Sequence, residues 1–570
     1  MKTKAKNSYH KYINISNCIF LILLVCSSTV SSSTFFVGDT YIYVKWVYVL
    51  LFATLLTVSE SLWLTKTKST VTFSRNEIIA IFLFLCICAL KYLQNDVEWS
   101  IKGLSCFILL LYFKSRNEMT PTNTSFEHTL IIIALTSSFY ALFQYLHKDT
   151  TTNMSGFYDN PVGFAFTISI AAILVTKQLT ICTSTCYKVI YSIILVFMII
   201  VICMSGSRTG MISLFLCLCI ALKNIRKYLI VAFLCVSTLS ILFLKTDSSQ
   251  GRLFIYKTTI SMFDNPHDIL FGKGTKGFEK HYMTYQAKAL KSADENTKNR
   301  ADDIKHPLNE FLLFGIDNGL LPTALLLLSF IIYAWGKPKD IVTIQTFIVI
   351  CLFSSFSYPF KYPISWIVLA WCLSNTKAFG QQYTNTKYAT LAFAYITSAI
   401  CISSFLIETI PSLLTWRQAY DQSRLGFTDK ALFLYRKAAK KCSYSEFYYN
   451  YSSFLLNCGR YQQAMQIIDK CQIASYDVQL LKAEISMSEK RYKQANMYCN
   501  IAHEMCPNRF RPLMCMFYIY AKIGCITKQK AIAQIIVKKR VKINSPEINR
   551  YKAEAKKFLR QHPQKSNQNL

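Results

Sequence analysis

Long apolar runs recur up to about residue 409, and they constrain the fold more than any other feature of the sequence. Each run is ~15–22 residues long, close to the length that an α-helix needs to cross the ~30 Å hydrocarbon layer of a bilayer. The predicted fold class is therefore all-α, beginning with a polytopic transmembrane helical bundle of about 12–13 spans. The expected spans are 15–30, 41–58, 77–93, 99–114, 128–146, 162–176, 187–204, 209–222, 227–245, 311–334, 341–357, 362–375 and 388–408.

The first span follows a basic segment that contains Lys2, Lys4, Lys6 and Lys11. A basic segment before an apolar run is also typical of a secretory signal peptide. No small-residue cleavage site follows the run cleanly, so we interpret it as a retained helix.

Lysine and arginine in the short loops predict the orientation, because cytoplasmic loops carry the excess of positive charge. With the N-terminus inside, the outer short loops hold only Lys148, Arg208 and Lys361. Thirteen crossings then place the long loop 246–310 and the chain from 410 onward outside. An error of one span would reverse the prediction for the C-terminal part.

The C-terminal part carries 28 Lys/Arg against 10 Asp/Glu, which is +18 of the formal net charge of +32. A basic surface that faces the bilayer favours membrane lipids with anionic headgroups, or anionic glycans. Nucleic acid is not expected as a partner of an external domain.

None of the 21 cysteines forms a C-x-x-C pair, and pairs such as Cys86/Cys88 lie inside apolar spans. Such thiols act as small apolar side chains, so neither a metal site nor a cofactor is predicted. The C-terminal part holds an odd number of cysteines, which argues against an oxidising compartment unless the thiols are buried.

Three related segments recur in the C-terminal part: LGFTDKALFLYRKAA, CGRYQQAMQIIDKC and EKRYKQANMYCNIAHEMCPN. Their equivalent alanines, Ala431, Ala464 and Ala495, lie 33 and 31 residues apart. A period near 34 residues resembles a degenerate tetratricopeptide array, an α-solenoid of stacked helical hairpins. We expect this repeat domain over 410–560 and a disordered tail over 561–570. A peptide or protein partner and a plain helical bundle without a ligand are both compatible with it.

Two short elements on the predicted outer side carry arginine. The segment MSGSRTG breaks two apolar helices, with Ser207 and Arg208 at its turn. A guanidinium beside free backbone N–H groups can bind phosphate oxygens, although one arginine at the headgroup level would look the same. The segment GRLFIYKTTI opens the long loop with Arg252 and Lys257, and it also fits an interfacial helix.

Three further elements lie on the same side. The segment FGKGTKGF lacks the G-x-x-x-x-G-K-[ST] spacing, which excludes a nucleotide-binding loop. In KHPLNEFLLFGIDNGL, His306 precedes Asn309 and Glu310. A histidine titrates near neutral pH and can take a proton from a hydroxyl nucleophile, although most loop histidines are only solvated. In MSGFYDNPVGFAF, Asn160 precedes a proline and predicts a helix start.

Taken in order over roughly residues 150–375, these elements resemble the superfamily of O-antigen ligases, O-antigen polymerases and O-oligosaccharyltransferases. The resemblance implies transfer of a glycan from a polyprenyl (undecaprenyl) pyrophosphate carrier to an acceptor hydroxyl. It places the reaction at the outer face of the bacterial cytoplasmic membrane, without a metal ion. Arg208 and Arg252 correspond to the arginines that the family uses in catalysis. Ser207, Lys257, Asn160 and Asn309 are expected to contact substrate.

The family's histidine corresponds to His306, as the base that activates the acceptor. The family commonly places asparagine next to that histidine, whereas Pro307 and Leu308 separate His306 from Asn309 here. Glu310 is therefore a rival base.

Several functions remain compatible with the sequence. The leading hypothesis is an O-antigen ligase, with lipid A core, a polysaccharide or a protein as the acceptor. A polysaccharide polymerase and a protein O-oligosaccharyltransferase keep the same fold. A transporter or flippase would use Lys45, the one charge inside the second span, but the sequence shows no repeated halves and no interrupted helices. A non-catalytic scaffold would leave the outer arginines without a role.

Overall fold

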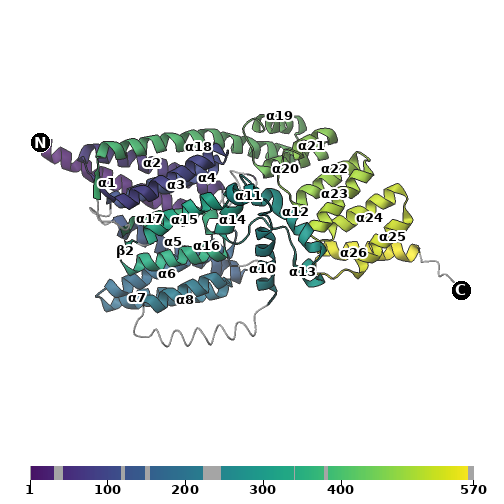
Figure 1. Cartoon of the computed structure of the whole chain (residues 1–570), viewed down its shortest axis with the longest axis horizontal. Helices are drawn as coiled ribbons and strands as arrows, with labels where there is room; N and C mark the ends of the chain where they lie inside the picture. The colour runs from purple at the N-terminus through teal and green to yellow at the C-terminus, as the bar shows by residue number, and fades with distance from the viewer. Residues whose placement is uncertain are drawn as a thin grey trace. The chain divides into compact units, whose positions relative to one another are not determined.

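The computed structural model consists almost entirely of helices, and it divides into two compact units (Figure 1). Unit 1 comprises Met1–Leu244 and Leu308–Tyr420, and unit 2 comprises Lys245–Pro307 and Asp421–Leu570. The structure describes residues 2–30, 37, 43–116, 122–147, 154–221, 246–334, 336–338, 340–377, 383–542 and 544–562.

Unit 1 is the apolar bundle. Its helices are α1 (Lys2–Ser27), α2 (Tyr43–Thr67), α3 (Arg75–Leu93), α4 (Val97–Arg116), α5 (Thr122–Leu146), α6 (Pro161–Ile181), α7 (Thr185–Ser205), α8 (Arg208–Ala221), α14 (Glu310–Asn318), α15 (Leu320–Ala334), α16 (Ile341–Phe356), the 3-10 turn η1 (Pro359–Lys361), α17 (Pro363–Ser374) and α18 (Tyr388–Arg424). Among the described residues, six helices are long and apolar enough to cross a membrane: α2, α3, α5, α6, α7 and α18. Five more, within α1, α8, α15, α16 and α17, are apolar but shorter. The chain is thus a multi-helix membrane protein.

Burial separates the centre of this bundle from its lipid-facing side. Helix α6 buries every residue from 163 to 176, and α17 is buried along its whole length. Helix α7, in contrast, leaves Ile193 and Val196 exposed. Apolar side chains that face outward suit a bilayer rather than water. Helix α1 packs against α2 and α5, and its retention in the mature protein stays a prediction.

The loops that the charge rule places inside contact one another. Strand β1 (Val71–Ser74) pairs antiparallel with β4 (Tyr383–Thr386), and β2 (Lys337–Pro338) pairs with β3 (Thr376–Lys377). Carboxylates near the same loops form ion pairs: Glu60 with Arg116 at 2.5 Å, Glu77 with Lys114 at 2.5 Å and Glu127 with Lys177 at 2.6 Å. Buried partners in such pairs neutralise each other, so these charges have a structural explanation.

The helix ends that the charge rule places outside also contact one another. The Trp46 indole N–H donates to the Lys361 carbonyl at 3.2 Å, and the rings of Trp99 and Phe314 lie 5.6 Å apart. The grouping of helix ends therefore agrees with the predicted alternation of spans, while the side of the membrane stays a prediction.

Three expected spans need comment. The span predicted over 99–114 corresponds to α4, which belongs neither to the six long apolar helices nor to the five shorter ones among the described residues. The span predicted over 311–334 is wrong as a single helix, because α14 ends at Asn318 and α15 starts at Leu320. Gly319 breaks it with φ 86°, so one helix is interrupted, contrary to the expectation of none. The span predicted over 227–245 lies outside the described residues.

Unit 2 combines the long loop with the repeat domain. The loop forms α10 (Thr246–Ile260), α11 (Pro266–Phe271), α12 (Gly277–Lys291) and α13 (Glu295–Arg300). The repeat domain forms α19 (Thr428–Ala438), α20 (Ser445–Asn457), α21 (Tyr461–Ile468), α22 (Tyr476–Ser488), α23 (Tyr492–Met505), α24 (Arg511–Ile523), α25 (Ile526–Lys538) and α26 (Pro546–Gln561). Gln561, expected to be disordered, ends α26, and residues 563–570 lie outside the described part.

Consecutive helices of the repeat domain pair through short turns, which is consistent with a solenoid. The three equivalent alanines, Ala431, Ala464 and Ala495, are fully buried. Before α19, α21, α23 and α25, one turn residue adopts positive φ: Gly426, Gly459, Lys490 and Gly524. The last of these turns belongs to a hairpin that the sequence pattern concealed, because Gln529 stands where the earlier hairpins place alanine.

The loop packs directly on the repeat domain within unit 2. Helix α12 lies against α23, and the Gln286 amide donates both to the Met505 carbonyl at 2.8 Å and to the Asp302 carbonyl at 2.9 Å. The Arg509 guanidinium pairs with Asp302 at 2.5 Å. Loop and repeat domain must therefore lie on the same side of the membrane, as the even number of spans between them predicts.

The odd number of cysteines in the repeat domain argued against an oxidising compartment, and the burial of several thiols weakens that argument. Four thiols of the repeat domain, Cys442, Cys471, Cys499 and Cys506, are buried and free. Buried thiols resist oxidation because they rarely form the reactive thiolate. Reduced thiols at these buried positions are therefore compatible with an outer location.

Candidate functional site

The turn around Arg208 has the geometry that its sequence predicts. Helix α7 ends at Gly206, whose φ of 68° reverses the chain. The Ser207 hydroxyl oxygen accepts from the Gly210 N–H at 3.3 Å and so caps α8. Arg208 is therefore the first residue of α8, half-buried, and the positive end of the helix dipole adds to its charge.

Gly210 fixes the start of α8 against the centre of the bundle. A Cβ at this position would lie 2.9 Å from the Ala165 Cβ of α6, which is closer than side chains normally approach. Only glycine permits this contact, so the start of α8 packs closely against α6 two residues after Arg208. A cation at a helix start suits a phosphate group.

Asn160 occupies the helix start that the sequence predicts. Its side-chain oxygen accepts from the Val162 N–H at 3.0 Å and caps α6. This structural role explains the residue, and its contact with substrate stays a prediction.

The preceding residue, Asp159, belongs to a polar cluster that sequence reasoning missed. Its carboxylate accepts from Lys361 at 2.8 Å and from the Tyr362 hydroxyl at 2.6 Å. Partial burial opposes the charge, but the Lys361 ammonium and both hydrogen bonds lower the pKa of Asp159 below its ordinary value. The one feature of the sequence that could have pointed to this cluster is Lys361, because basic residues are rare in the outer short loops.

Lys45 supports the same segment. Its ammonium donates to the Phe157 carbonyl at 2.8 Å and lies 5.6 Å from the Tyr158 ring centre, and the side chain is fully buried. A charge inside a span marks a functional candidate. In this bundle the Lys45 side chain connects α2 to the GFYDNP segment, residues 156–161. A structural role therefore explains the charge on which the transporter hypothesis depended.

Asn309 and Glu310 start α14, and both make bonds to other elements of unit 1. The Asn309 oxygen caps α14 through the Leu312 N–H at 2.9 Å, and its amide donates to the Ser355 carbonyl at 2.9 Å. One Glu310 oxygen accepts from the Phe360 N–H at 2.9 Å. Both residues therefore hold neighbouring segments together.

Arg252 and Lys257 lie on α10 in unit 2. The face of α10 that packs in the unit contains Ile255, Thr258 and Thr259, which are buried. Arg252 is half-buried and Lys257 is exposed. Partial burial raises the pKa of the Tyr256 hydroxyl, and the Arg252 guanidinium opposes that rise because it lies one helical turn away.

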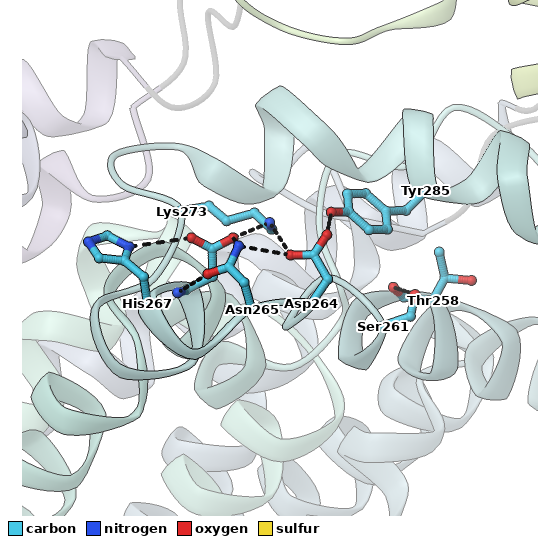
Figure 2. A network of polar contacts seen from close by, with 8 residues as sticks. Thr258, Ser261, Asp264, Asn265, His267, Lys273 and Tyr285 are labelled. Atoms are coloured by element: carbon cyan, nitrogen blue, oxygen red, sulfur yellow. Dashed lines mark hydrogen bonds and ion pairs between the residues drawn. The ribbon is translucent and has the colours of Figure 1, made fainter.

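Lys273 of the FGKGTKGF segment belongs to a polar network, and the segment does not act as a phosphate-binding loop (Figure 2). The Lys273 ammonium pairs with Asp264 at 3.1 Å and with Asp268 at 2.5 Å, and the Tyr285 hydroxyl donates to Asp264. These bonds from Tyr285 and Lys273 lower the pKa of Asp264 to about 2. Because Lys273 is already neutralised, it shapes the loop between α11 and α12.

His306 lies on the non-helical segment that follows α13, and it is half-buried. Leu308, two residues later, adopts φ 57°, a left-handed conformation that is strained for a branched side chain. The strain therefore falls on one of the two residues that separate His306 from Asn309. Strained backbone of this kind is often found at functional sites.

The expected site residues divide between the units. Unit 1 holds Asn160, Ser207, Arg208, Asn309 and Glu310, and unit 2 holds Arg252, Lys257 and His306. Within the described residues, no group of three or more His, Cys, Asp or Glu side chains gathers as metal ligands do. Independence from metal stays a prediction.

Residues 193–327 match the family described as O-Antigen ligase. The match runs from α7 into α15 and includes Arg208, Arg252, His306 and Glu310. No curated protein matches the chain. The chain thus contains an O-antigen ligase family domain, a class associated with transfer of glycans from lipid carriers. The resemblance drawn from the motifs is confirmed for this segment.

Proposed function

We propose that this protein transfers a glycan from polyprenyl pyrophosphate to an acceptor hydroxyl, as an O-antigen ligase does, at the outer face of the bacterial cytoplasmic membrane. The family match over residues 193–327 carries the proposal. The placement of Arg208 at a capped helix start, on a backbone held against α6, supports it.

In the proposed reaction, the acceptor oxygen attacks the anomeric carbon of the donor sugar in line with the leaving group. The new glycosidic C–O bond forms while the bond from that carbon to the pyrophosphate oxygen breaks. The electron pair leaves with the pyrophosphate, whose charge Arg208 and Arg252 neutralise. Ser207, Lys257, Asn160 and Asn309 are proposed to contact the substrates.

His306 is proposed as the base that takes the proton of the acceptor hydroxyl. Glu310 remains the rival. The bond from the Phe360 N–H to the Glu310 carboxylate supports a structural role for that group, which favours His306.

Three single variants test these roles: Arg208→Ala, Arg252→Ala and His306→Ala, each with Lys188→Ala as a control. Lys188 is an exposed basic residue of α7 outside the proposed site. We expect the three variants to insert at wild-type levels and to lose surface glycan, and the control to keep it. Wild-type surface glycan in all three would overturn the assignment.

A deletion strain separates the possible acceptors. Accumulation of full-length carrier-linked glycan indicates a ligase, whereas loss of chain length indicates a polymerase. Loss of glycan from proteins alone indicates a protein O-oligosaccharyltransferase.

The proposed outer location of the repeat domain has its own test. A reporter of membrane side, fused after residue 410, should give a periplasmic signal. A cytoplasmic signal would place both the repeat domain and the long loop inside, because they pack together in unit 2.

A further inference from the structure

A basic groove of about 810 Å³ lies between the long loop and the repeat domain, within unit 2. Helices α12 and α13 supply one wall, and α23 and α25 with the residues after them supply the other. Five basic residues line it, against two acidic ones, Glu295 and Glu504. The basic residues are Lys291, Lys298, Lys538, Lys539 and Arg540.

The two acidic residues already have basic partners. Glu504 lies 3.5 Å from Lys291, and Glu295 lies 3.5 Å from Lys298. Among the described residues, no carboxylate lies within 4.0 Å of Lys538, Lys539 or Arg540. Positive charge therefore remains in excess along one wall.

Lys539 is the most enclosed member of that wall. Its ammonium donates to the Pro507 carbonyl and lies 5.6 Å from the centre of the Phe510 ring. Burial lowers its pKa to about 8, because the charge has lost water and the Glu295 carboxylate opposes that shift only in part. A bound anion would restore that lost stabilisation.

His503 lies next to this charge. Its Nδ1 atom is buried and has no hydrogen-bond partner among the described residues. Burial and the Lys539 ammonium lower the pKa of its imidazole to about 4. A neutral ring of this kind still offers one N–H donor to a ligand oxygen. The groove thus combines cations with an unsatisfied polar group.

The groove also lies close in sequence to the proposed base. Asn299 lines it, and His306 follows seven residues later. An extended chain covers at most ~3.6 Å per residue, so the two Cα atoms lie within roughly 25 Å. The bond of Arg509 to Asp302 holds the intervening segment on the repeat domain, and Gln286 of α12 donates to the same residue.

We propose that this groove binds the acceptor through a phosphorylated saccharide, whose phosphoryl oxygens face Lys538, Lys539 and Arg540. Multiple ammonium and guanidinium groups recognise phosphate through charge-assisted hydrogen bonds. A concave site of this volume suits a few sugar units, whereas a lipid surface is bound by an amphipathic helix with an exposed apolar face. The assignment of the ligand as acceptor rests on the proposed function.

Binding to the full chain in detergent micelles tests the groove without any transfer step. The probes are mannopentaose 6-phosphate, the same mannopentaose without phosphate, and vesicles of phosphatidylglycerol. The test variant is Lys538→Glu with Arg540→Glu, since both side chains are exposed. The control is Lys556→Glu with Lys557→Glu, an equal charge change at exposed positions of α26 outside the groove.

We expect the phosphorylated probe to bind at least about tenfold more tightly than the unphosphorylated one, because charged hydrogen bonds stabilise it. The groove variant should lose about tenfold in affinity or more, and the control less than about twofold. Equal binding of the two saccharides, equal losses in both variants, or binding of the vesicles alone would each overturn the proposal.

The same measurement in the Arg208→Ala chain separates this inference from the proposed function. Wild-type affinity for the phosphorylated probe, in a chain that no longer transfers glycan, supports both. If the wild-type chain binds the probe but transfers nothing, the groove stands as a saccharide site and the proposed function fails.

Discussion

Units 1 and 2 hold their share of the expected site residues by different means. In unit 1, Arg208 starts a capped helix whose Gly210 is pressed against α6. In unit 2, His306 lies on a segment without regular structure, which the repeat domain holds in place. The difference indicates a cation carried by the apolar bundle and a proposed base whose position depends on the repeat domain. The predictions below test that difference.

The largest effect is expected at the base. His306→Ala should lower the rate of glycan transfer by about 10²–10⁴-fold, because a positioned general base contributes that much. Glu310→Gln keeps the size of the side chain and most of its bond to Phe360, so the rate should fall by less than about tenfold. Initial rates with purified protein decide between them. The reverse order would make Glu310 the base.

A matched pair of glycine substitutions compares the two arginine segments. In Gly210→Ala, the new Cβ meets Ala165 at 2.9 Å, whereas in Gly251→Ala it meets nothing within 4 Å. We expect Gly210→Ala to destabilise the protein by about 1–3 kcal/mol through overpacking. Gly251→Ala should stabilise α10 by up to about 1 kcal/mol, because alanine favours a helix. Thermal unfolding measures both. Equal effects of the two substitutions would contradict the claim that α8 packs more tightly at Gly210 than α10 does at Gly251.

The dependence of the long loop on the repeat domain can be tested at Gln286, which is buried. Gln286→Ala removes the bonds to Met505 and Asp302 and should destabilise unit 2 by about 1–3 kcal/mol. Hydrogen exchange should increase in α12 and α23 but not in α6. Increased exchange in α6 as well would show that the substitution acts on the whole protein.

The smallest effect is expected at Leu308. Leu308→Gly removes a strain of about 1–2 kcal/mol but gives the unfolded chain more freedom, so the net stability should rise by less than about 1 kcal/mol. If the strain positions His306, the transfer rate should fall although stability does not. An unchanged rate would show that the strain has no role in the reaction.

The helical class, most of the apolar helices and the paired helices of the repeat domain were predictable, because each depends on residues close in sequence. Asn160 as a helix start and the turn around Ser207 and Arg208 are such local features, and the structure confirms both. The hairpin with α25 escaped notice because Gln529 replaces the small residue of the pattern.

Features that depend on distant residues were not predictable. Nothing near Gln286 indicates that its amide bonds to Met505, more than 200 residues later. Lys45 looked like a charge available for transport until its bond to Phe157 was visible. The break at Gly319 is instead a local feature, because Asp317, Asn318 and Gly319 interrupt the apolar run and are typical of a helix end.

The most direct test of the central claim is glycan transfer by the purified protein in liposomes. The donor is a polyprenyl pyrophosphate-linked glycan, and the acceptor is a saccharide with a free hydroxyl. We predict that the wild-type chain forms the glycosidic product and releases polyprenyl pyrophosphate in equal amounts, and that Arg208→Ala forms neither. Movement of the donor across the bilayer without product would contradict the account and favour a transporter.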